Sequence, residues 1–415
     1  MERLRNPIRS YAWGSHTDIG ELLGAAVPTA EPQAELWMGA HPSAPSVLGD
    51  GTALDARIAT DPDQTLGRRV RGEFGARLPF LFKVLAAEVP LSLQAHPNAE
   101  QARNGFAAEE RSGRPRDAPE RNYRDPFGKP ELLCALAPTE ALCGFREVAT
   151  TAELLAELAA PRLLPWAHAR SWQTPADALR ELVTYLLTVP AAARAPLVTE
   201  VADACRAAPR DSRFAAEHAV VRRLAAAYPD DVGAVTAILL NHVLLEPGEA
   251  VYLPAGNLHT YLSGFGVEVM AGSDNVLRGG LTGKRIDVAE LLRVLDFSDG
   301  PPPVVHPEQV GPQEWTWPTP SREFRLSRVD AAGDAAGDAA GDASGGAADA
   351  AGRAVRLRDT GGPEILLVVA GTITVRSGSA DPVRLVRGES VFKPAADPAL
   401  TLSGSGTVYR VTTAA

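Results

Sequence analysis

Residues 248–259 read GEAVYLPAGNLH, with the spacing Gly, five residues, Pro, one residue, Gly, two residues and His. The Pro-Gly pair at 247–248 predicts a turn into a strand, and residues 250–254 (AVYLP) predict the strand itself. The Pro and Gly near its end predict a bend that leaves His259 directed inward. A histidine alone on a strand is more often a satisfied core residue, so this stretch needs partners elsewhere in the chain.

The spacing resembles the second sequence motif of cupin barrels, in which the histidine is a metal ligand. A second copy of the Gly, five residues, Pro spacing stands at 388–394 (GESVFKP), but Ala396 and Ala399 occupy the Gly and His positions that would follow. The resemblance therefore implies two cupin-type jelly-roll barrels, of which the second holds no metal and has a structural role.

The regions around these motifs predict a mainly β protein with a helical insert. Apolar runs at 78–86, 89–97 and 129–138 predict strands, and the polar stretch 97–125 predicts a surface helix followed by a loop. Residues 150–232 carry apolar side chains at helical spacing, which predicts a block of helices with a scaffolding role.

Strand-like sequence returns at about residue 233, before a short helix at 287–297 and a Pro-rich linker. We therefore predict a catalytic metal-binding barrel formed by 1–150 and 233–297, a helical insert at 151–232, and a C-terminal metal-free barrel at 298–415. A four-residue repeat, DAAGDAAGDAAGDASG, begins at 330 and lacks large apolar residues, so a disordered loop is predicted near 330–352.

Composition restricts the classes of function. The 415 residues include 41 Lys and Arg against 51 Asp and Glu, a formal net charge of −10, which argues against a nucleic-acid or membrane-surface protein. Three cysteines without a CxxC pair argue against a disulfide scaffold and a thiolate zinc site. Without a secretory leader or a long apolar run, the expected protein is cytoplasmic, with no membrane partner. We also expect a monomer.

Two short segments supply candidate partners for His259. In SLQAHP (92–97), Gln94 and His96 are two residues apart and therefore share one face of a strand. In GKPEL (128–132), Lys129 and Glu131 share a face in the same way, which favours an ion pair or a metal with an anionic ligand. Two His, one Gln and one Glu form a nitrogen and oxygen ligand set that suits one zinc ion per chain.

A fourth segment, GVEVMAGSDNVLRGGLTGKR (266–285), places Glu268 in an apolar β run. Asp274 follows at the start of a loop, and Arg278 and Lys284 are basic in an otherwise acidic chain. The glycines between these two cations offer backbone amides that could approach a phosphate. The alternative is a solvated loop with exposed cations.

Six stretches, in this order, resemble motifs of the type I mannose-6-phosphate isomerase family: YAWGS (11–15), AELWMGAHPSAPS (34–46), PLSLQAHPN (90–98), DPFGKPEL (125–132), LPAGNLHTYL (253–262) and SDNVLRGGLTGK (273–284). The resemblance implies a metal-dependent isomerase that interconverts mannose 6-phosphate and fructose 6-phosphate through a cis-enediol. It assigns the zinc ligands to Gln94, His96, Glu131 and His259.

The resemblance also assigns roles around the metal. It implies that Arg278 is the active-site arginine and that Ser92 and Lys284 contact the phosphate. Lys129 and Glu268 match residues that line the pocket. Two further residues, Trp13 and Asp274, fall in matching motifs and are predicted to bind substrate.

The sequence departs from the family at two positions. Many relatives carry His where this chain has Gly128. If that His were the essential base, this chain would lack it, so we expect a base elsewhere, with Glu268 as the leading candidate. Several relatives carry Lys where this chain has Ala99, which removes one cation near the phosphate. Two alternatives stay open: a metal-cupin oxygenase that activates O₂, and a non-catalytic sugar-phosphate-binding cupin.

Overall fold

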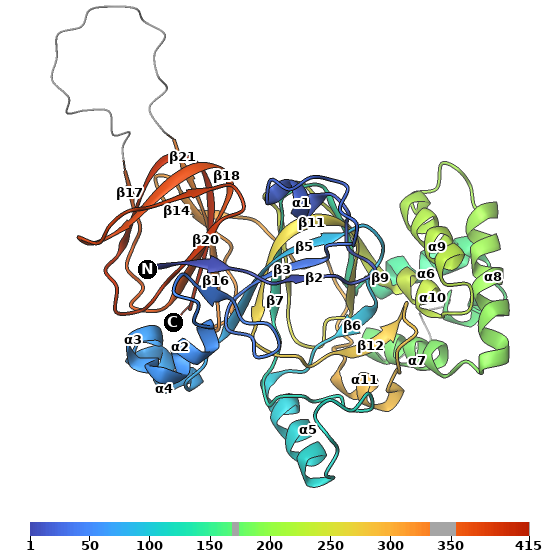
Figure 1. Cartoon of the computed structure of the whole chain (residues 1–415). Helices are drawn as coiled ribbons and strands as arrows, with labels where there is room; N and C mark the ends of the chain where they lie inside the picture. Colours follow the sequence, from blue (N-terminus) through green and yellow to red (C-terminus); the bar gives the residue numbers. More distant parts are fainter. Residues whose placement is uncertain (168–173, 333–353, 415) are drawn as a thin grey trace, which may run out of the picture. The chain divides into compact units, whose positions relative to one another are not determined.

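The computed structural model describes residues 1–167, 174–332 and 354–414 (Figure 1). From residue 333 on, the predicted disordered loop near 330–352 lies outside the described residues. The chain forms two compact units: unit 1 comprises Met1–Ala86, Val267–Gly272 and Val305–Ala415, and unit 2 comprises Ala87–Gly266 and Ser273–Val304. The domain borders expected from the sequence stay a prediction.

Unit 1 is built mainly of antiparallel strands. Its strands are β1 (Glu2–Arg5), β2 (Ile8–Arg9), β3 (Glu35–Met38), β4 (Val47–Leu48), β5 (Phe80–Ala87), β14 (Glu308–Gly311), β15 (Glu314–Thr316), β16 (Arg325–Ala331), β17 (Val355–Arg356), β18 (Glu364–Ser377), β19 (Val383–Val386), β20 (Ser390–Lys393) and β21 (Leu400–Thr412). Its helices are α1 (Asp18–Leu22), α2 (Leu54–Thr60), α3 (Pro62–Leu66) and α4 (Arg68–Phe74).

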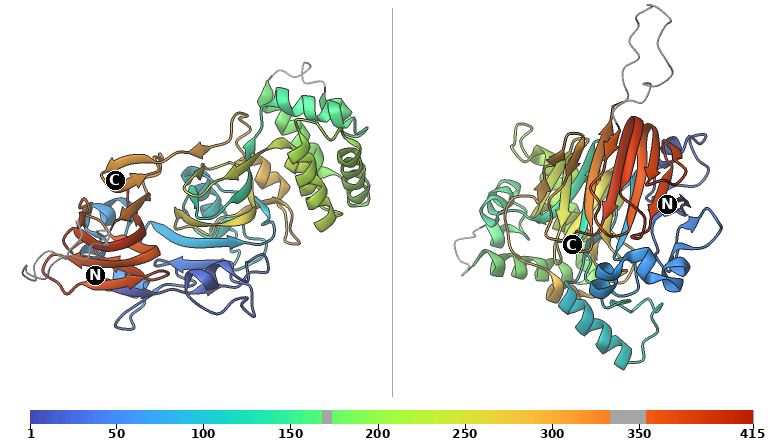
Figure 2. Two further views of the ribbon diagram at one scale, coloured as in Figure 1. Left: turned by 90° about the horizontal axis from the view of Figure 1, so that it is seen from above. Right: turned by 90° about the vertical axis from the view of Figure 1, so that its left-hand side faces the viewer.

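The larger sheet of unit 1 has the order β14-β15-β16-β21-β18-β20-β1-β4. The long strands β18 and β21 pair along their whole length, from Glu364 opposite Thr412 to Ser377 opposite Leu400 (Figure 2). Apolar side chains that alternate along these strands form a core that includes Leu366, Val375 and Leu402. The first strand of the chain, β1, pairs with β20, so the N-terminal segment completes a sheet made mostly of C-terminal residues.

A second set of strands in unit 1 has the order β5-β3-β2, with the end of β11 (His259–Ala271) next to β5. All eight residues of β5, FLFKVLAA, are buried, as expected for a strand covered on both faces. One of these eight residues is Lys83, a cation that needs a partner in such a place.

Unit 2 combines strands with most of the helices. Its strands are β6 (Leu93–Ala95), β7 (Glu131–Ala135), β8 (Thr139–Phe145), β9 (Leu240–Leu245), β10 (Ala250–Leu253), the first part of β11, β12 (Leu277–Gly280) and β13, which begins at Val304 and ends at Val305. Its helices are α5 (Ala99–Arg111), α6 (Val148–Leu158), η1 (Leu164–Ala167), α7 (Pro175–Thr188), α8 (Ala191–Ala207), α9 (Ala215–Ala227), α10 (Gly233–Thr236), η3 (Ala237–Leu239) and α11 (Val288–Val294).

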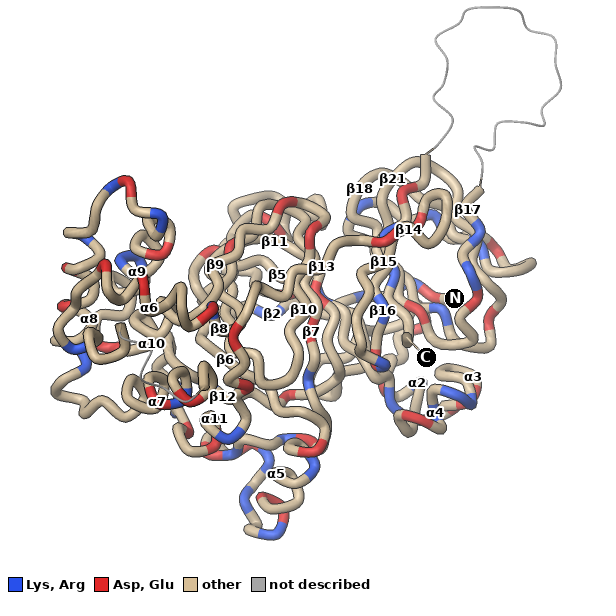
Figure 3. Tube along the Cα trace, turned by 180° about the vertical axis from the view of Figure 1, so that it is seen from behind, with Lys and Arg blue, Asp and Glu red and all other residues tan. Residues whose placement is uncertain are grey.

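The helices of unit 2 begin where the sequence supplies caps. Asn98 and Gln101 form a capping box at the start of α5, and the Thr174 hydroxyl accepts from the Asp177 N–H at the start of α7. Helices α6 to α10 lie together as one group (Figure 1), and their apolar faces share one core with strand residues such as Leu93 and Leu142. Figure 3 shows that α5 carries charges of both signs.

Two elements differ from the sequence-based expectation. The strand predicted at 89–97 is only three residues long in β6, because the flanking prolines 90 and 97 have no N–H for a ladder. Residues 233–239, expected to be strand-like, form the helical turns α10 and η3 instead. A short apolar run does not distinguish a buried strand from a buried helical turn.

Within the described ranges, no single helix is both long and apolar enough to span a membrane. The pair α7 and α8 satisfies length and composition only together, with a bend of 118° between the two helices.

Candidate metal centre

Three strands of unit 2 bring the predicted residues of the site together. Strand β6 lies between β11 and β12, and Gln94 is opposite His259 on one side and opposite Arg278 on the other. Residues directly opposite each other in an antiparallel pair project from the same face of the sheet. The register therefore places Gln94, His259 and Arg278 on one face.

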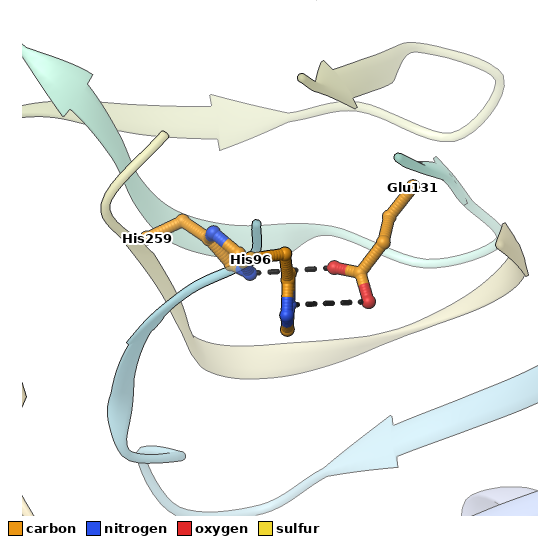
Figure 4. A group of neighbouring side chains, drawn as sticks. All are labelled: His96, Glu131 and His259. Atoms are coloured by element: carbon orange, nitrogen blue, oxygen red, sulfur yellow. Dashed lines mark ion pairs between the residues drawn. The ribbon is translucent and has the colours of Figure 1, made fainter. Parts of the chain in front are cut away.

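The two predicted histidines point toward one carboxylate. His96 directly follows β6 and His259 begins β11, and each imidazole is 1 % exposed. The His96 Nε2 lies 3.4 Å from Glu131 Oε1, and the His259 Nε2 lies 3.3 Å from Glu131 Oε2 (Figure 4). We call these three residues, His96, Glu131 and His259, the metal cluster.

Backbone carbonyl groups fix the orientation of both rings. The His96 Nδ1 is 2.7 Å from the carbonyl oxygen of Asn275, and the His259 Nδ1 is 3.0 Å from that of Asn257. Because a carbonyl oxygen only accepts, each Nδ1 must carry the proton and donate it. In a neutral imidazole held in this way, Nε2 carries the lone pair and faces Glu131, which is the arrangement of histidines that ligate metals.

Burial keeps the His96 imidazole neutral. Desolvation lowers the pKa of His96 to about 4, against the opposing attraction of Glu131. Burial alone would raise the pKa of Glu131, but its charged surroundings, with the Lys129 ammonium 3.1 Å away, lower it well below its usual range. The cluster thus offers an anionic carboxylate and a neutral imidazole at neutral pH, as metal binding requires.

The metal cluster fits a divalent cation. Nitrogen and oxygen atoms of its three residues lie within 4.8 Å of one another, and in the described part of the chain it is the one such group of His, Cys, Asp and Glu. The Nε2 atoms of His96 and His259 are buried and have no hydrogen-bond partner in the described ranges of the chain. Orphaned buried acceptors are costly, and a cation bound between them would remove that cost.

Lys129 lies next to the metal cluster, just before β7. Its Nζ is 3.1 Å from Glu131 Oε1, and the residue is 8 % exposed. The ion pair expected from the spacing of Lys129 and Glu131 is therefore present.

Arg278, on β12, and Lys284, in the loop after it, belong to a group of cations. Burial and repulsion by Arg124 lower the pKa of Arg278, and repulsion by Arg278 lowers that of Lys284, followed by burial and Arg124. Among the residues that the structure describes, neither Arg278 nor Lys284 is paired with a carboxylate. Such a group of cations favours an anionic ligand.

Lys284 also lines a pocket of about 480 Å³ in unit 2, between α7, α8 and the loop after β12. Arg194, Asp230, Asp231 and Thr282 are among its other lining residues. Ser92 is half-buried in the segment before β6.

The other two residues predicted to bind substrate are Asp274 and Trp13. Asp274 is exposed, and its backbone N–H donates to Asp125 Oδ2 over 2.7 Å. Trp13 belongs to unit 1, where its ring stacks on Tyr11 with centroids 5.7 Å apart.

Glu268 also belongs to unit 1, near the end of β11, and is 2 % exposed. Its carboxylate is ion-paired with the Lys83 ammonium, which also lies 3.1 Å from Glu35 Oε1. The Trp37 Nε1–H donates to the other Glu35 oxygen over 2.8 Å. The sequence placed Lys83 on a strand but did not predict its ion pairs. A lysine among eight otherwise apolar strand residues was a signal that could have pointed to them, because a buried cation needs a partner.

Comparison with known proteins gives concordant results. A family model described as phosphomannose isomerase type I, catalytic domain, matches residues 1–148. The mannose-6-phosphate isomerase of Escherichia coli K12 is 38% identical over 99% of this chain and 99% of its own length. The human mannose-6-phosphate isomerase is 34% identical over 70% of this chain and 72% of its own length.

Solved structures agree with these sequence matches. A crystal structure of mannose 6-phosphate isomerase bound with zinc and yttrium superposes with a TM-score of 0.87 at 36% identity, covering 100% of this chain and 99% of that chain. A zinc-bound holo structure of mannose 6-phosphate isomerase also gives a TM-score of 0.87 at 36% identity and covers 99% of both chains.

Proposed function

The chain belongs to the type I phosphomannose isomerase family, and from that premise we propose that it interconverts mannose 6-phosphate and fructose 6-phosphate with zinc held at the metal cluster. The observation that carries the proposal is the buried metal cluster with two orphaned imidazole nitrogens, in a chain that matches these isomerases over nearly its whole length.

Zinc suits the residues of the cluster. Two imidazole nitrogens and one carboxylate are a usual protein ligand set for catalytic zinc, which can take a fourth and at times a fifth ligand. We propose Gln94 as a further ligand, which its register opposite His259 supports. When bound, zinc supplies positive charge that orients sugar oxygens and stabilises negative charge on them.

The basic residues suit the phosphorylated substrate. We propose that Lys284 and Ser92 bind the phosphate and that Arg278 stabilises the enediolate or holds the sugar. Neither Arg278 nor Lys284 has a carboxylate partner among the described residues, which supports this, because an anion would relieve their mutual repulsion. Binding the remote phosphate fixes the reacting carbons in place. Substrate contacts by Trp13 and Asp274 stay predictions.

The reaction requires a base that takes the proton from C2 of mannose 6-phosphate and delivers it to C1. We propose Glu268 for this step, with Lys129 as a further catalytic group. The buried ion pair with Lys83 supports this proposal, because it holds the Glu268 carboxylate in a fixed position. Glu268→Gln should nearly abolish turnover while zinc content stays intact, and near-normal turnover would reject Glu268 as the base.

We also propose the finer architecture predicted from the sequence: two cupin-type jelly-roll barrels with an inserted α-helical domain. The antiparallel strands and the helices at 148–236 support it. A cytoplasmic location and a monomeric state stay predictions from the sequence.

The test is an assay that follows fructose 6-phosphate and mannose 6-phosphate in both directions, with and without a chelator and with zinc added back. We expect turnover that the chelator abolishes and zinc restores, and that persists without oxygen. A requirement for O₂ would favour the oxygenase alternative. Bound zinc without any turnover would favour the non-catalytic sugar-phosphate-binding protein.

A further inference from the structure

A buried amide lies in the loop between β11 and β12. Asn275 is 0 % exposed, and its side chain satisfies both of its polar atoms on one segment. Its Oδ1 accepts from the N–H groups of Arg124 (2.8 Å) and Asp125 (3.3 Å). Its Nδ2 donates to the carbonyl oxygens of Asp125 (2.8 Å) and Phe127 (2.9 Å) and to Asp125 Oδ1 (3.3 Å). Only one orientation of the amide satisfies all these partners.

The backbone of the same residue orients a metal ligand. The Asn275 carbonyl oxygen accepts from His96 Nδ1 over 2.7 Å. His259, by contrast, uses the carbonyl of Asn257, only two residues earlier in its own loop. The His259 contact is therefore local, whereas the His96 contact depends on a loop from a distant part of the chain.

Asn275 stands between the other segments of the site. The segment 124–127, which its side chain holds, leads directly to Lys129 and to Glu131 at the start of β7. Three residues after Asn275 comes Arg278, which is in register with Gln94. One buried amide thus connects the segments that carry the cluster carboxylate and the site arginine, and its carbonyl orients an imidazole.

We propose that Asn275 is a positioning residue of the metal centre, which fixes the tautomer of His96 and holds the segment 124–127 at the distance that the metal cluster requires. The inference deepens the proposed function and rests on it for the presence of zinc. Outer partners of this kind set ligand orientation, and their loss typically lowers metal affinity or activity by about 10–100-fold.

Two substitutions separate the contributions of the side chain. Asn275→Asp keeps an acceptor for the Arg124 N–H but places an oxygen where Nδ2 meets the oxygens of Asp125 and Phe127. Asn275→Ala removes both halves of the network. We expect each variant to bind zinc about 10–100-fold more weakly than the unaltered chain.

The measurement is zinc affinity of the purified full chain by competition with a chromophoric chelator, together with the visible spectrum of the Co²⁺-loaded protein. A shifted cobalt spectrum reports changed ligand geometry, which a loss of fold stability alone would not produce. Wild-type affinity with an unchanged spectrum in folded Asn275→Ala would overturn the proposal.

Two further variants keep the test decisive. Asn122→Ala is the matched control, because it removes a hydrogen bond from the same stretch of chain to Asp287 (3.0 Å) without touching residue 275. Its zinc affinity should be unchanged, and an equal loss would overturn the assignment.

Ser273→Ala removes the hydroxyl that accepts from the Asn275 N–H (3.2 Å) and donates to the Phe127 carbonyl (3.1 Å). For Ser273→Ala we expect a measurable loss of zinc affinity that stays below about tenfold, because only one link is removed. If Asn275→Ala does not fold, unchanged affinity in Ser273→Ala overturns the proposal. Zinc affinity is measured without sugar phosphate. A chain that lacks isomerase activity but loses zinc on substitution of Asn275 would therefore refute the proposed function and support this inference.

Discussion

Two buried carboxylates, one in each unit, stand at the start of a strand. The buried negative charge of each has to be compensated, and the neighbouring side chains differ between the two. Glu131 begins β7 in unit 2 and is 3 % exposed, and Glu364 begins β18 in unit 1 and is 0 % exposed. Around Glu364 stand two cations: the Arg410 Nε lies 2.6 Å and the Lys393 Nζ 3.4 Å from its carboxylate oxygens. We call these three residues, Glu364, Lys393 and Arg410, the Glu364 cluster.

Glu131 is surrounded differently. One ammonium, that of Lys129, is 3.1 Å away, and its other close neighbours are two imidazoles whose Nε2 atoms have no hydrogen-bond partner. In the Glu364 cluster two cations face the carboxylate, and the buried atom that lacks a hydrogen-bond partner among the described residues is a donor, Lys393 Nζ. In the metal cluster the atoms without such a partner are imidazole nitrogens, which an added cation would satisfy. A buried carboxylate thus becomes a metal site when neutral nitrogen acceptors, rather than further cations, face it.

The largest expected effect comes from removing a ligand. In His259→Ala, one orphaned nitrogen disappears together with its metal bond, so we expect zinc content to fall to a small fraction. Turnover should fall by more than the roughly 100-fold typical of losing an outer partner. Metal analysis and the isomerase assay measure both. Full zinc occupancy in the variant would show that His259 is not needed to hold the metal, and would contradict the contrast between the two clusters.

Breaking the Glu364 cluster should instead affect stability. Glu364→Gln removes the buried carboxylate that Lys393 and Arg410 share, and leaves them only Asp359 (3.8 Å) and Glu314 (3.3 Å) as carboxylate partners among the described residues. Removing one partner of a buried ion pair costs about 3–5 kcal/mol of unfolding free energy. Zinc content should not change. Chemical denaturation of the variant measures the loss.

The matched control for Glu364→Gln is Glu389→Gln in the same unit. Glu389 lies 2.6 Å from the Arg3 guanidinium, but both side chains are over 40% exposed (45% for Arg3 and 41% for Glu389). An exposed pair is worth less than about 1 kcal/mol. Equal losses in the two variants would contradict the distinction between the clusters.

Removal of the metal should lower the free energy of unfolding by less than Glu364→Gln does. At free zinc 100-fold above its dissociation constant, binding to the folded state contributes about 2.7 kcal/mol, which a chelator removes. Because the Glu364 cluster shares no residue with the metal cluster, the chelator should cost the same in Glu364→Gln as in the unaltered chain. Thermal unfolding with and without chelator tests this, and an unchanged midpoint would show that zinc does not stabilise the fold.

The smallest expected effect concerns Gly128, one residue before Lys129. A Cβ at this position would lie 2.9 Å from the backbone nitrogen of Ala99, so the start of α5 would have to move. We expect Gly128→Ala to cost about 1–3 kcal/mol of unfolding free energy. Gly49→Ala is the control, because a Cβ there meets nothing within 4 Å. An unchanged free energy of unfolding in Gly128→Ala would show that the start of α5 can move away from residue 128 without cost.

The sequence motifs anticipated the metal cluster because each ligand stands in a short pattern with a geometric meaning. The spacing after Pro254 singled out His259, and the pairs at 94–96 and 129–131 supplied its partners. The motifs did not show that both histidines donate Nδ1–H to carbonyl groups, because one of these carbonyls belongs to distant Asn275. Such contacts depend on the packing of loops, which no local pattern encodes.

Other features were missed for similar reasons. Glu364, Lys393 and Arg410 come from three different strands, and each is unremarkable in its own segment. Lys83 was detectable as a cation in an apolar run, but its partners Glu35 and Glu268 lie on other strands. Helical turns at 233–239 were read as strand because apolar runs of that length fit both periods.

The order of the ligands along the chain has a consequence for how the protein is made. Glu131 precedes helices α6 to α10 and His259 follows them, so the whole helical region is synthesised between two residues that must meet. A growing chain on the ribosome therefore has no complete zinc site until β11 has emerged. Loading of the full metal cluster therefore follows synthesis of the helical region, and before that only His96 and Glu131 of the cluster are present.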